Sequence, residues 1–412
     1  MSFSEWKEEM LSDVIEFNPS EKIVKDTMMK KVSMEKISPC TRKIYDYEET
    51  VFNGGSKFRN GDTLMARITP CLENGKIAQV DILDDGEVGF GSTEFIVMRE
   101  KVGKTINDFV YYLSISNQIK NKAIQSMTGT SGRQRVQNDV LFNYKLFIPP
   151  IHEQRAIAAT LTCIDDLIEQ NKRTNKILDE MTQAIFKHWF VDFEFQNEDD
   201  QPYKSSGGKM VDSELGLIPL GWQAVELGNV TINMRDKTRT NDFRVLSAVN
   251  TGNLKLSEEY FTKQVFSKDL SKYIIVRNKE FAYNPARVNI GSIGMNEYNF
   301  DGCVSPVYVV FKAEEDYHWF FKLFIKTDNF KSEVIKRASG SVRQAMNYCD
   351  FALIKTVYPP KSVIDKFNQI FEVTYFAQKE LTKEIEILIN IRDILLPKLI
   401  SGEILLPVEE GV

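Results

Sequence analysis

The chain has 412 residues, of which 42% are hydrophobic, 27% charged and 11% aromatic, the composition of an ordinary globular protein of several domains. Its formal net charge of -6 excludes a chain that is basic throughout. Nucleic-acid binding would therefore need a local concentration of positive charge.

The sequence shows no sign of membrane insertion, a disulfide framework or a metal site. No stretch of 18 uninterrupted apolar residues occurs, and the segment Met1–Lys7 lacks the apolar core of a signal peptide, so we expect no membrane association and a cytoplasmic location. The five cysteines form no C-x-x-C pair, and the three histidines are dispersed. This pattern predicts reduced, buried thiols and no metal.

Taken from its start, the chain is a tandem repeat with a period near 210 residues. A segment led by Trp6 is matched by one led by Trp222, and the block 131–150 is matched by 341–360. In that block an Arg-Gln pair and a Pro-Pro pair recur at the same offset of 210 residues. The repeat predicts two related globular domains.

Each half contains predicted strands followed by a predicted helix. Residues 61–68 and 91–99 in the first half, and 273–284 and 302–312 in the second, have the apolar character of buried strands. Helices are expected over 107–126 and 317–337. Each globular part is thus expected to be mixed α and β.

After each Pro-Pro pair comes a long helical pattern, since proline suits the first turn of a helix. Both patterns carry a heptad repeat of apolar residues, which predicts a coiled coil of two antiparallel helices, each of roughly 40 residues and on the order of 60 Å long. The predicted seam comprises Ile157, Ile164, Asn171, Leu178, Ile185, Phe367, Leu381, Leu388 and Leu395. In the first helix, Leu167 and Met181 follow the seam residues Ile164 and Leu178 by three positions, and Leu161 and Ile168 are expected on the flank. In the second helix, the residues beside the seam are Ile370, Phe371, Ile385 and Ile391.

Two alternatives stay open for these helices. They could be unrelated amphipathic helices, each packed on its own domain, although both follow the same sequence block in the same register. Asn171 could be a polar seam residue that fixes the register, or a side chain that faces solvent.

The polar, glycine-containing stretch from Glu194 to Gly221 is expected to be an exposed connector between the first helix and the second globular domain.

Motifs of catalysis are missing from the sequence. It has no phosphate loop of the form G-x-x-x-x-G-K-[ST], no Asn/Asp-Pro-Pro-Tyr motif, no H-E-x-x-H and no G-x-S-x-G. The glycines of Val88–Gly91 precede a predicted strand, which favours a turn over a cofactor loop. We therefore expect no catalytic residue in this chain.

DNA contact is predicted in the loops that follow the covering helices. Arginine can form a bidentate hydrogen-bonded pair with guanine, and glutamine with adenine, while serine, threonine and backbone N–H groups suit phosphates. A solvated basic loop, or an arginine that braces the helix below, is the structural alternative. The candidates are Arg133, Gln134, Arg135, Lys336, Arg337, Arg343 and Gln344, with Arg67, Lys76, Arg287 and Asn289 in loops after matched strands.

Three motifs carry a resemblance to a known family. They are Ile148–Ile157 with the helix that ends at Glu194, the connector Met210–Trp222, and the closing segment Leu395–Ile404. Together with the repeat, they make the chain resemble the specificity (S) subunits of type I restriction-modification systems over essentially its whole length. The family's Pro-Pro-x-x-Glu-Gln motif is kept at Pro149–Gln154 but is Pro359–Ile364 in the second half, which puts a shared role of Glu153 and Gln154 in doubt.

The resemblance implies a domain plan. Residues 1–150 would form the first target recognition domain and 151–193 the central conserved helix. Residues 194–360 would form the connector and second target recognition domain, and 361–412 the C-terminal conserved helix. The two helices would be antiparallel, with a pseudo-twofold relation between the domains.

The resemblance also implies a function without catalysis. Each recognition domain would bind one half of a split site on double-stranded DNA, and the helices would set the spacer. Two methylation subunits would use S-adenosylmethionine to methylate adenine at N6, and motor-nuclease subunits with ATP and magnesium would cleave unmodified DNA. No cofactor is expected on this chain. The alternatives are a self-contained DNA methyltransferase or nuclease with unrecognised motifs, and a coiled-coil scaffold that binds no DNA.

Overall fold

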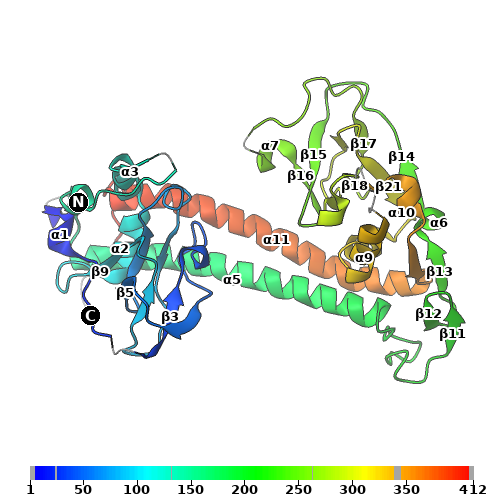
Figure 1. Ribbon diagram of the computed structural model, residues 1–412, viewed down its shortest axis with the longest axis horizontal. Coiled ribbons are helices and arrows are strands. Elements are labelled where there is room, and N and C mark those ends of the chain that lie inside the picture. The colour runs from blue at the N-terminus through cyan, green and yellow to red at the C-terminus, as the bar shows by residue number, and fades with distance from the viewer. Residues whose placement is uncertain (1–4, 24–25, 131, 262, 338–344, 408–412) are drawn as a thin grey trace. The chain divides into compact units, whose positions relative to one another are not determined.

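A computed structural model describes residues 5–23, 26–130, 132–261, 263–337 and 345–407. The chain divides into two compact units: unit 1 comprises residues 1–174 and 381–412, and unit 2 comprises residues 175–380. Each unit is therefore built from two kinds of segment, a sheet-bearing globular part and portions of two long helices (Figure 1). Among the described residues, no helix combines the length and apolarity needed to cross a membrane.

Unit 1 contains two four-stranded sheets and a two-stranded ribbon. The first sheet has the order β2-β9-β6-β7 and is antiparallel throughout, whereas the second, β4-β3-β8-β5, contains one parallel pair, β3 with β8. The ribbon pairs β1 with β10, so the two ends of the globular part meet. The elements are β1 (Lys7–Met10), α1 (Leu11–Val14), β2 (Ile15–Phe17), β3 (Met28–Val32), β4 (Glu48–Val51), β5 (Ser56–Phe58), β6 (Thr63–Ala66), β7 (Ile77–Gln79), β8 (Gly89–Gly91), β9 (Phe95–Glu100), α2 (Asn107–Ile115), α3 (Asn117–Gln125), α4 (Asn138–Phe142) and β10 (Lys145–Ile148), with a short 3-10 turn at Met34–Lys36.

Unit 2 repeats this topology strand for strand. Its sheets have the orders β14-β21-β18-β19 and β16-β15-β20-β17, again with one parallel pair, β15 with β20, and its ribbon pairs β13 with β22. The elements are β13 (Gln223–Glu226), α6 (Leu227–Val230), β14 (Thr231–Met234), β15 (Arg244–Val249), β16 (Asn253–Leu256), α7 (Ser257–Tyr260), β17 (Ile274–Val276), β18 (Phe281–Tyr283), β19 (Ile293–Met295), β20 (Gly302–Val304), β21 (Val309–Ala313), α8 (His318–Phe324), α9 (Asp328–Arg337), α10 (Tyr348–Ala352) and β22 (Lys355–Tyr358), with a 3-10 turn at Val288–Ile290. The predicted repeat of mixed α and β parts is confirmed.

Several predicted elements are each divided in two. The apolar run 91–99 spans the end of β8 and most of β9, which belong to different sheets, and 302–312 likewise spans β20 and β21. The expected helices 107–126 and 317–337 are broken at Ser116 and after Phe324. A single apolar run was wrongly taken as one strand because periodicity alone does not show where the chain changes sheet.

The connector between Glu194 and Gly221 is mostly exposed, as expected, but it also contains a hairpin of β11 (Met210–Ser213) and β12 (Gly216–Pro219). Phe195 and Ile218 anchor it in the core of unit 2. The connector is therefore an ordered part of that unit.

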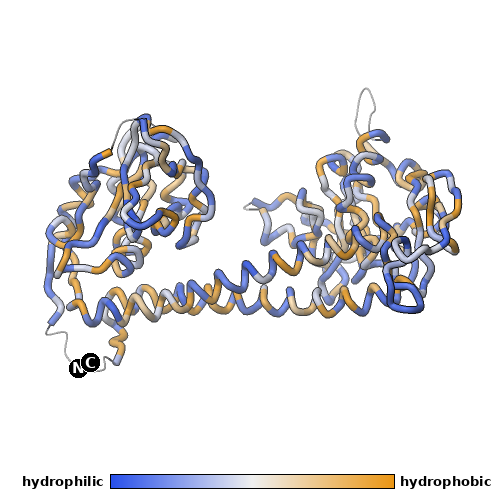
Figure 2. The backbone as a smooth tube through the Cα atoms, turned by 90° about the horizontal axis from the view of Figure 1, so that it is seen from below, coloured by the Kyte–Doolittle hydropathy of each residue, from blue (hydrophilic) through white to orange (hydrophobic). Residues whose placement is uncertain are grey.

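The two long helices are α5 (Ile151–Phe190) and α11 (Lys361–Ile400). Early residues of α5 pack with late residues of α11 in unit 1, where Asp165 pairs with Arg392, and the reverse holds in unit 2, where Phe186 contacts Phe367. The helices are thus antiparallel, as predicted. Figure 2 shows hydrophobic and hydrophilic residues alternating along both long helices.

The buried positions of the helices correct part of the predicted heptad. The predicted seam residues are all buried or half-buried, but Leu167 and Met181 are exposed, and so are Ile370 and Ile391. The second seam position of α5 is instead formed by Leu161, Ile168, Asn175, Thr182 and Trp189, and that of α11 by Ile364, Phe371, Gln378, Ile385 and Arg392. This second row was not recognised from apolar spacing because Asn175, Thr182, Gln378 and Arg392, which belong to it, are polar.

Asn171 is half-buried, and its amide nitrogen is shielded from solvent without a hydrogen-bond partner. This environment favours a seam position over a side chain that faces solvent.

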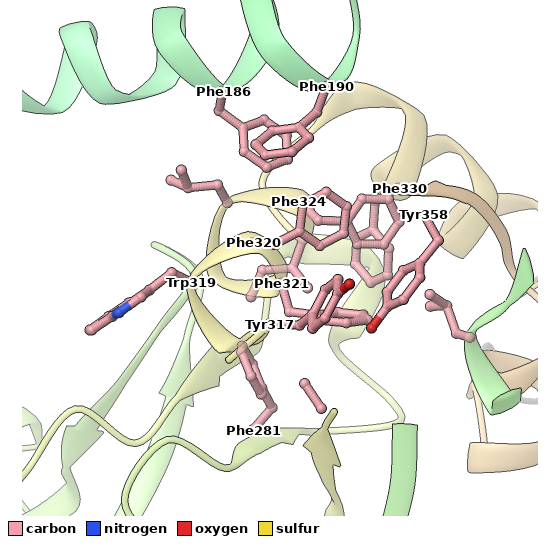
Figure 3. Packing of buried hydrophobic residues seen from close by; sticks show 14 of the residues in the cluster. Phe186, Phe190, Phe281, Tyr317, Trp319, Phe320, Phe321, Phe324, Phe330 and Tyr358 are labelled. Atoms are coloured by element: carbon pink, nitrogen blue, oxygen red, sulfur yellow. The ribbon is translucent and has the colours of Figure 1, made fainter. Parts of the chain in front are cut away.

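The helices join the globular parts through cores of different chemistry. In unit 1 the contacts are mainly aliphatic and include Leu161, Leu396 and Leu399. In unit 2 they are aromatic: Phe186 and Phe190 project from α5 toward Phe320 of α8, at ring distances of 5.5 and 5.1 Å (Figure 3). The same fold is therefore held by different side chains in its two copies.

One buried hydrogen bond shows how the repeat tolerates such change. In unit 1 the Gln154 amide donates to the Pro149 carbonyl at 2.8 Å. Ile364, 210 residues later, cannot donate, and the Tyr317 hydroxyl donates to the Pro359 carbonyl at 2.9 Å instead. Gln154 also bonds the Lys104 carbonyl and the Ile106 amide, so it ties the start of α5 to the globular part. Gln154 therefore does more than cap the helix, but this role exists only in the first half, because Ile364 cannot make these hydrogen bonds.

Candidate DNA-binding loops

Three loops of unit 1 are joined at one place by backbone hydrogen bonds. The loop after β6 is bonded to the loop after α3, from Val136 N to Arg67 O and from Thr69 N to Gln134 O. The turn before β9 joins them, because Arg67 N donates to Glu94 O. The predicted residues Arg67, Gln134 and Arg135 are therefore brought together although they are far apart in sequence.

Within this cluster Arg135 is held by an acid. Its guanidinium makes hydrogen bonds of 2.6 and 2.9 Å to the Glu94 carboxylate, which raise the pKa of Arg135. An arginine held in this way supports the bracing alternative, since its fork would have to leave Glu94 to contact a base. Glu94 was not predicted, and no local motif distinguishes it.

Arg133 and Gln134 differ in exposure. Arg133 is exposed at the tip of the loop, whereas Gln134 is half-buried. The tip is tight: Gly129 has a φ of +131°, and a Cβ there would lie 2.9 Å from the Arg133 carbonyl oxygen. Only glycine fits this close approach, and the turn leaves the Arg133 side chain in solvent.

Arg67 and Lys76 lie in different surroundings. Arg67 lines a polar surface cavity of about 350 Å³ together with Asn18, Lys57 and Thr93, and its Nε is buried without a partner. The Lys76 ammonium donates to the Met34 carbonyl at 2.8 Å. Arg67 thus lines the cavity while its Nε is shielded from solvent, whereas Lys76 already has a protein partner.

Unit 2 has the corresponding loops. Met346 N donates to Pro285 O, which matches the bond from Val136 to Arg67. Arg287 is exposed just beyond Pro285, and Asn289 is half-buried in the 3-10 turn. At the end of α9, Lys336 and Arg337 both face Glu333, at 2.7 and 3.6 Å. Arg343 and Gln344 lie outside the described residues.

Sequence reasoning missed another group of cations in unit 2. Arg235, Lys237 and Arg239 are exposed on the segment that follows β14. Their alternation, one cation at every second residue, was visible in the sequence and is typical of one side of an extended strand.

Polar contacts fasten the long helices to the globular part within each unit. In unit 1 the Tyr112 hydroxyl donates to Asp165 at 2.8 Å, and Arg392 donates to the same carboxylate at 3.1 Å. The residues 210 positions later are Lys322 and Tyr375, and the Lys322 ammonium lies 4.4 Å from the Tyr375 ring centre. Burial lowers the pKa of Lys322, while Glu297, at 2.7 Å, opposes that shift. The contacting positions are kept while their chemistry is exchanged.

Within the described ranges, one group of side chains could hold a metal ion: Glu5, His152 and Glu153, whose ligand atoms lie within 4.8 Å of one another. The group is largely exposed, and Glu153 also accepts a hydrogen bond from the Trp6 indole at 2.9 Å. Through this contact Glu153 ties Trp6, which immediately precedes β1, to the start of α5.

Comparison with known proteins agrees with a DNA specificity domain. Residues 3–179 match the type I restriction modification DNA specificity domain. The chain is 25% identical over 319 residues to the type I restriction enzyme MjaIX specificity subunit of Methanocaldococcus jannaschii, covering 73% of this chain and 69% of that protein. It is 24% identical over 411 residues to the HindI specificity subunit of Haemophilus influenzae, covering 84% and 87%.

The fold is also found in a solved structure. The S subunit of a type I restriction-modification system from M. genitalium superimposes with a TM-score of 0.58 and 14% identity, over 96% of both chains. The likeness extends beyond residue 179, so the second repeat shares it. Residues 3–179 thus match the specificity-domain family by sequence, and the chain as a whole is similar to type I restriction-modification specificity subunits in sequence and fold.

Proposed function

We propose that this chain is the DNA-recognition subunit of a type I restriction-modification enzyme, and that it directs adenine N6 methylation or cleavage by partner subunits without catalysing either reaction. The observation that carries the proposal is the doubled fold: the same arrangement of sheets and loops occurs twice, with different side chains in the equivalent loops. Two related domains with divergent loops suit a split site whose halves differ in sequence.

In this proposal residues 1–150 and 194–360 each bind one half-site, and the conserved helices set the unread spacer between them. Major-groove half-sites one turn apart are separated by about 34 Å. A helix of 40 residues is roughly 60 Å long, which permits such a spacing.

The exposed loop arginines are the proposed contacts to bases. Arg133 in the first half and Arg287 in the second are exposed, and a bidentate arginine–guanine contact contributes about 1–3 kcal/mol of discrimination. Arg135, Lys336 and Arg337 face carboxylates, so we assign them to phosphate contact or to bracing of the loops. Arg343 and Gln344 remain proposed contacts by their match to Arg133 and Gln134.

The partners proposed are double-stranded DNA, two methylation subunits and motor-nuclease subunits, with S-adenosylmethionine, ATP and magnesium bound by those partners. Such an assembly on chromosomal DNA would act in the cytoplasm. Exposed apolar residues on the long helices support binding of a protein partner. A single exposed apolar residue is ordinary, but several that lie close together are typical of an interaction surface. On α11 they include Ile387, Ile391 and Ile394, which are 58, 41 and 60% exposed.

The test uses the complex with its methylation subunits. Substituting Arg133 by alanine is expected to weaken binding to duplexes that retain the first half-site by about tenfold, with no change in preference at the second half-site. Arg173→Ala is the matched control, since Arg173 is exposed on α5 and is not among the proposed contacts. Equal loss on random DNA would count against base recognition by Arg133.

A second experiment tests the spacer. Insertion of one heptad into both α5 and α11 is expected to change the preferred spacer length. An unchanged spacer would refute that role of the helices. Transfer of labelled methyl groups by the purified chain alone would instead favour a self-contained enzyme, and the failure of the complex to bind DNA would favour a scaffold.

A further inference from the structure

The segment that follows β14 in unit 2 runs along the edge of the second sheet. Lys237 is paired with Ile274 of β17 in an antiparallel bridge, Thr238 N donates to Tyr273 O, and Ile275 N donates to Asp236 O. The segment therefore has the extended geometry of a short edge strand, in which successive side chains point to opposite sides.

This geometry separates the charged side chains from those that anchor the segment. Thr238 is buried and bonds the Leu270 carbonyl, whereas Arg235, Lys237 and Arg239 are exposed. Because two residues of a strand span about 6.6 Å, Arg235 and Lys237 lie about that far apart on one side of the strand. Arg239 follows at the end of the strand, where its φ of 58° turns the chain.

The row is not neutralised by its neighbours. Asp236, which alternates with the cations, is engaged by Arg277 at 2.7 Å. The three cationic side chains have no ion-pair partner within the part of the chain that the structure describes. Arg239 N donates to the carbonyl of Ser271, which brings the exposed Lys272 beside the row. Like charges this close on one segment repel one another, so an anionic partner would relieve that repulsion.

The first repeat lacks this feature. The Glu21 carbonyl accepts from Lys57 of β5 as the Asp236 carbonyl accepts from Ile275 of β17. Glu21 also pairs with Arg59 as Asp236 pairs with Arg277, so Glu21 is the counterpart of Asp236. The Glu21 carboxylate is buried between Arg59 and Arg99, at 2.6 and 2.7 Å. At the positions of Arg235, Lys237 and Arg239 the first repeat has Ser20, Lys22 and Val24, so it carries one cation where the second repeat carries three.

We propose that Arg235, Lys237 and Arg239 form a phosphate-binding strand, which holds the DNA backbone at the second half-site and has no equivalent at the first. The inference rests on the proposed function and adds to it a contact surface distinct from the loops that are proposed to contact bases. Regularly spaced cations without acceptor groups suit phosphates and carry no base preference. The second half-site is then bound by phosphate contacts of this strand in addition to the loops, whereas the first half-site is bound without such a strand.

The experiment compares two triple variants in the complex with the methylation subunits. In one, Arg235, Lys237 and Arg239 are changed to glutamine. In the control, the exposed Lys204, Lys209 and Lys366 of the same unit are changed to glutamine. Binding to a duplex with the recognition site and to an unrelated duplex is measured by fluorescence anisotropy between 50 and 200 mM KCl.

Each phosphate contact contributes about 0.9 to the slope of log K against log salt concentration, so the first variant is expected to reduce the slope by about 2.7 on both duplexes. The control is expected to leave it unchanged. Phosphate-ethylation interference should disappear at phosphates of the second half-site only.

A slope that stays unchanged in the first variant, while the wild-type complex binds its site selectively, would overturn the phosphate-binding strand and leave the proposed function intact. Equal reductions in both triple variants would overturn it as well, since they would show a diffuse effect of net charge. Absence of DNA binding by the wild-type complex would overturn both proposals. Since all three residues are exposed, the melting temperature of the variant should match the wild type.

Discussion

Substituting Asp165 by alanine should destabilise unit 1 far more than the loss of an exposed ion pair would. The side chains of Asp165 and Arg392 are only 8 and 12% exposed, and Asp165 also accepts from Tyr112. Removal of one member of a buried pair costs about 3–5 kcal/mol, because the other charge is left without its partner. Arg392 keeps a contact to Asp393 at 2.8 Å, so we expect the lower end, about 3 kcal/mol.

The assay is thermal unfolding, followed by calorimetry. For a unit of this size, 1 kcal/mol corresponds to about 2–4 °C, so the transition of unit 1 should fall by roughly 6–12 °C. The control is Asp166→Ala on the same helix and in the same unit, which breaks a pair to Lys43 whose side chains are 51 and 39% exposed. That pair should contribute less than about 0.5 kcal/mol.

A double variant tests the physical reason. If the cost arises from the stranded guanidinium, Asp165→Ala combined with Arg392→Met should be more stable than Asp165→Ala alone. An effect of Asp165→Ala no larger than that of Asp166→Ala would refute the reasoning, and so would a double variant that is less stable than either single one.

Two further predictions concern buried polar groups. Burial, with Lys279 nearby, lowers the pKa of His318 to about 4, so the unfolded state binds more protons than the folded state between pH 6.5 and 4. The stability that neutral His318 contributes is full above pH 6.5 and is lost as the pH falls, by about 3 kcal/mol at pH 4. In His318→Phe the urea concentration at the unfolding midpoint should therefore depend less on pH between 6.5 and 4. An equal pH dependence of the midpoint in the variant would contradict this. Gln154→Leu should cost about 2–3 kcal/mol, because the buried Pro149 carbonyl and the partly buried Lys104 carbonyl and Ile106 N–H lose their partner. Ile364→Leu should cost less than about 1.5 kcal/mol in the same measurement.

Much of the architecture could be predicted because it is local. The heptad pattern and the Pro-Pro pairs act within a few turns of helix, so α5 and α11 begin where the sequence indicates. The repeated Arg-Gln to Pro-Pro block and the matched tryptophans showed that the fold is doubled. These signals depend on spacing along the chain and need no knowledge of what lies opposite.

The sequence by itself thus determined the resemblance to a family, the doubled mixed α and β fold and the two long helices, because periodicity and motif spacing can be followed along the chain. Only the tertiary structure decided which side chains are available. It paired Arg135 with Glu94 and left Arg235, Lys237 and Arg239 open on a sheet edge. It also substituted Tyr317 for the hydrogen bond of Gln154. Such outcomes depend on partners far away in the chain, and a charge is free or neutralised according to what packs beside it in space.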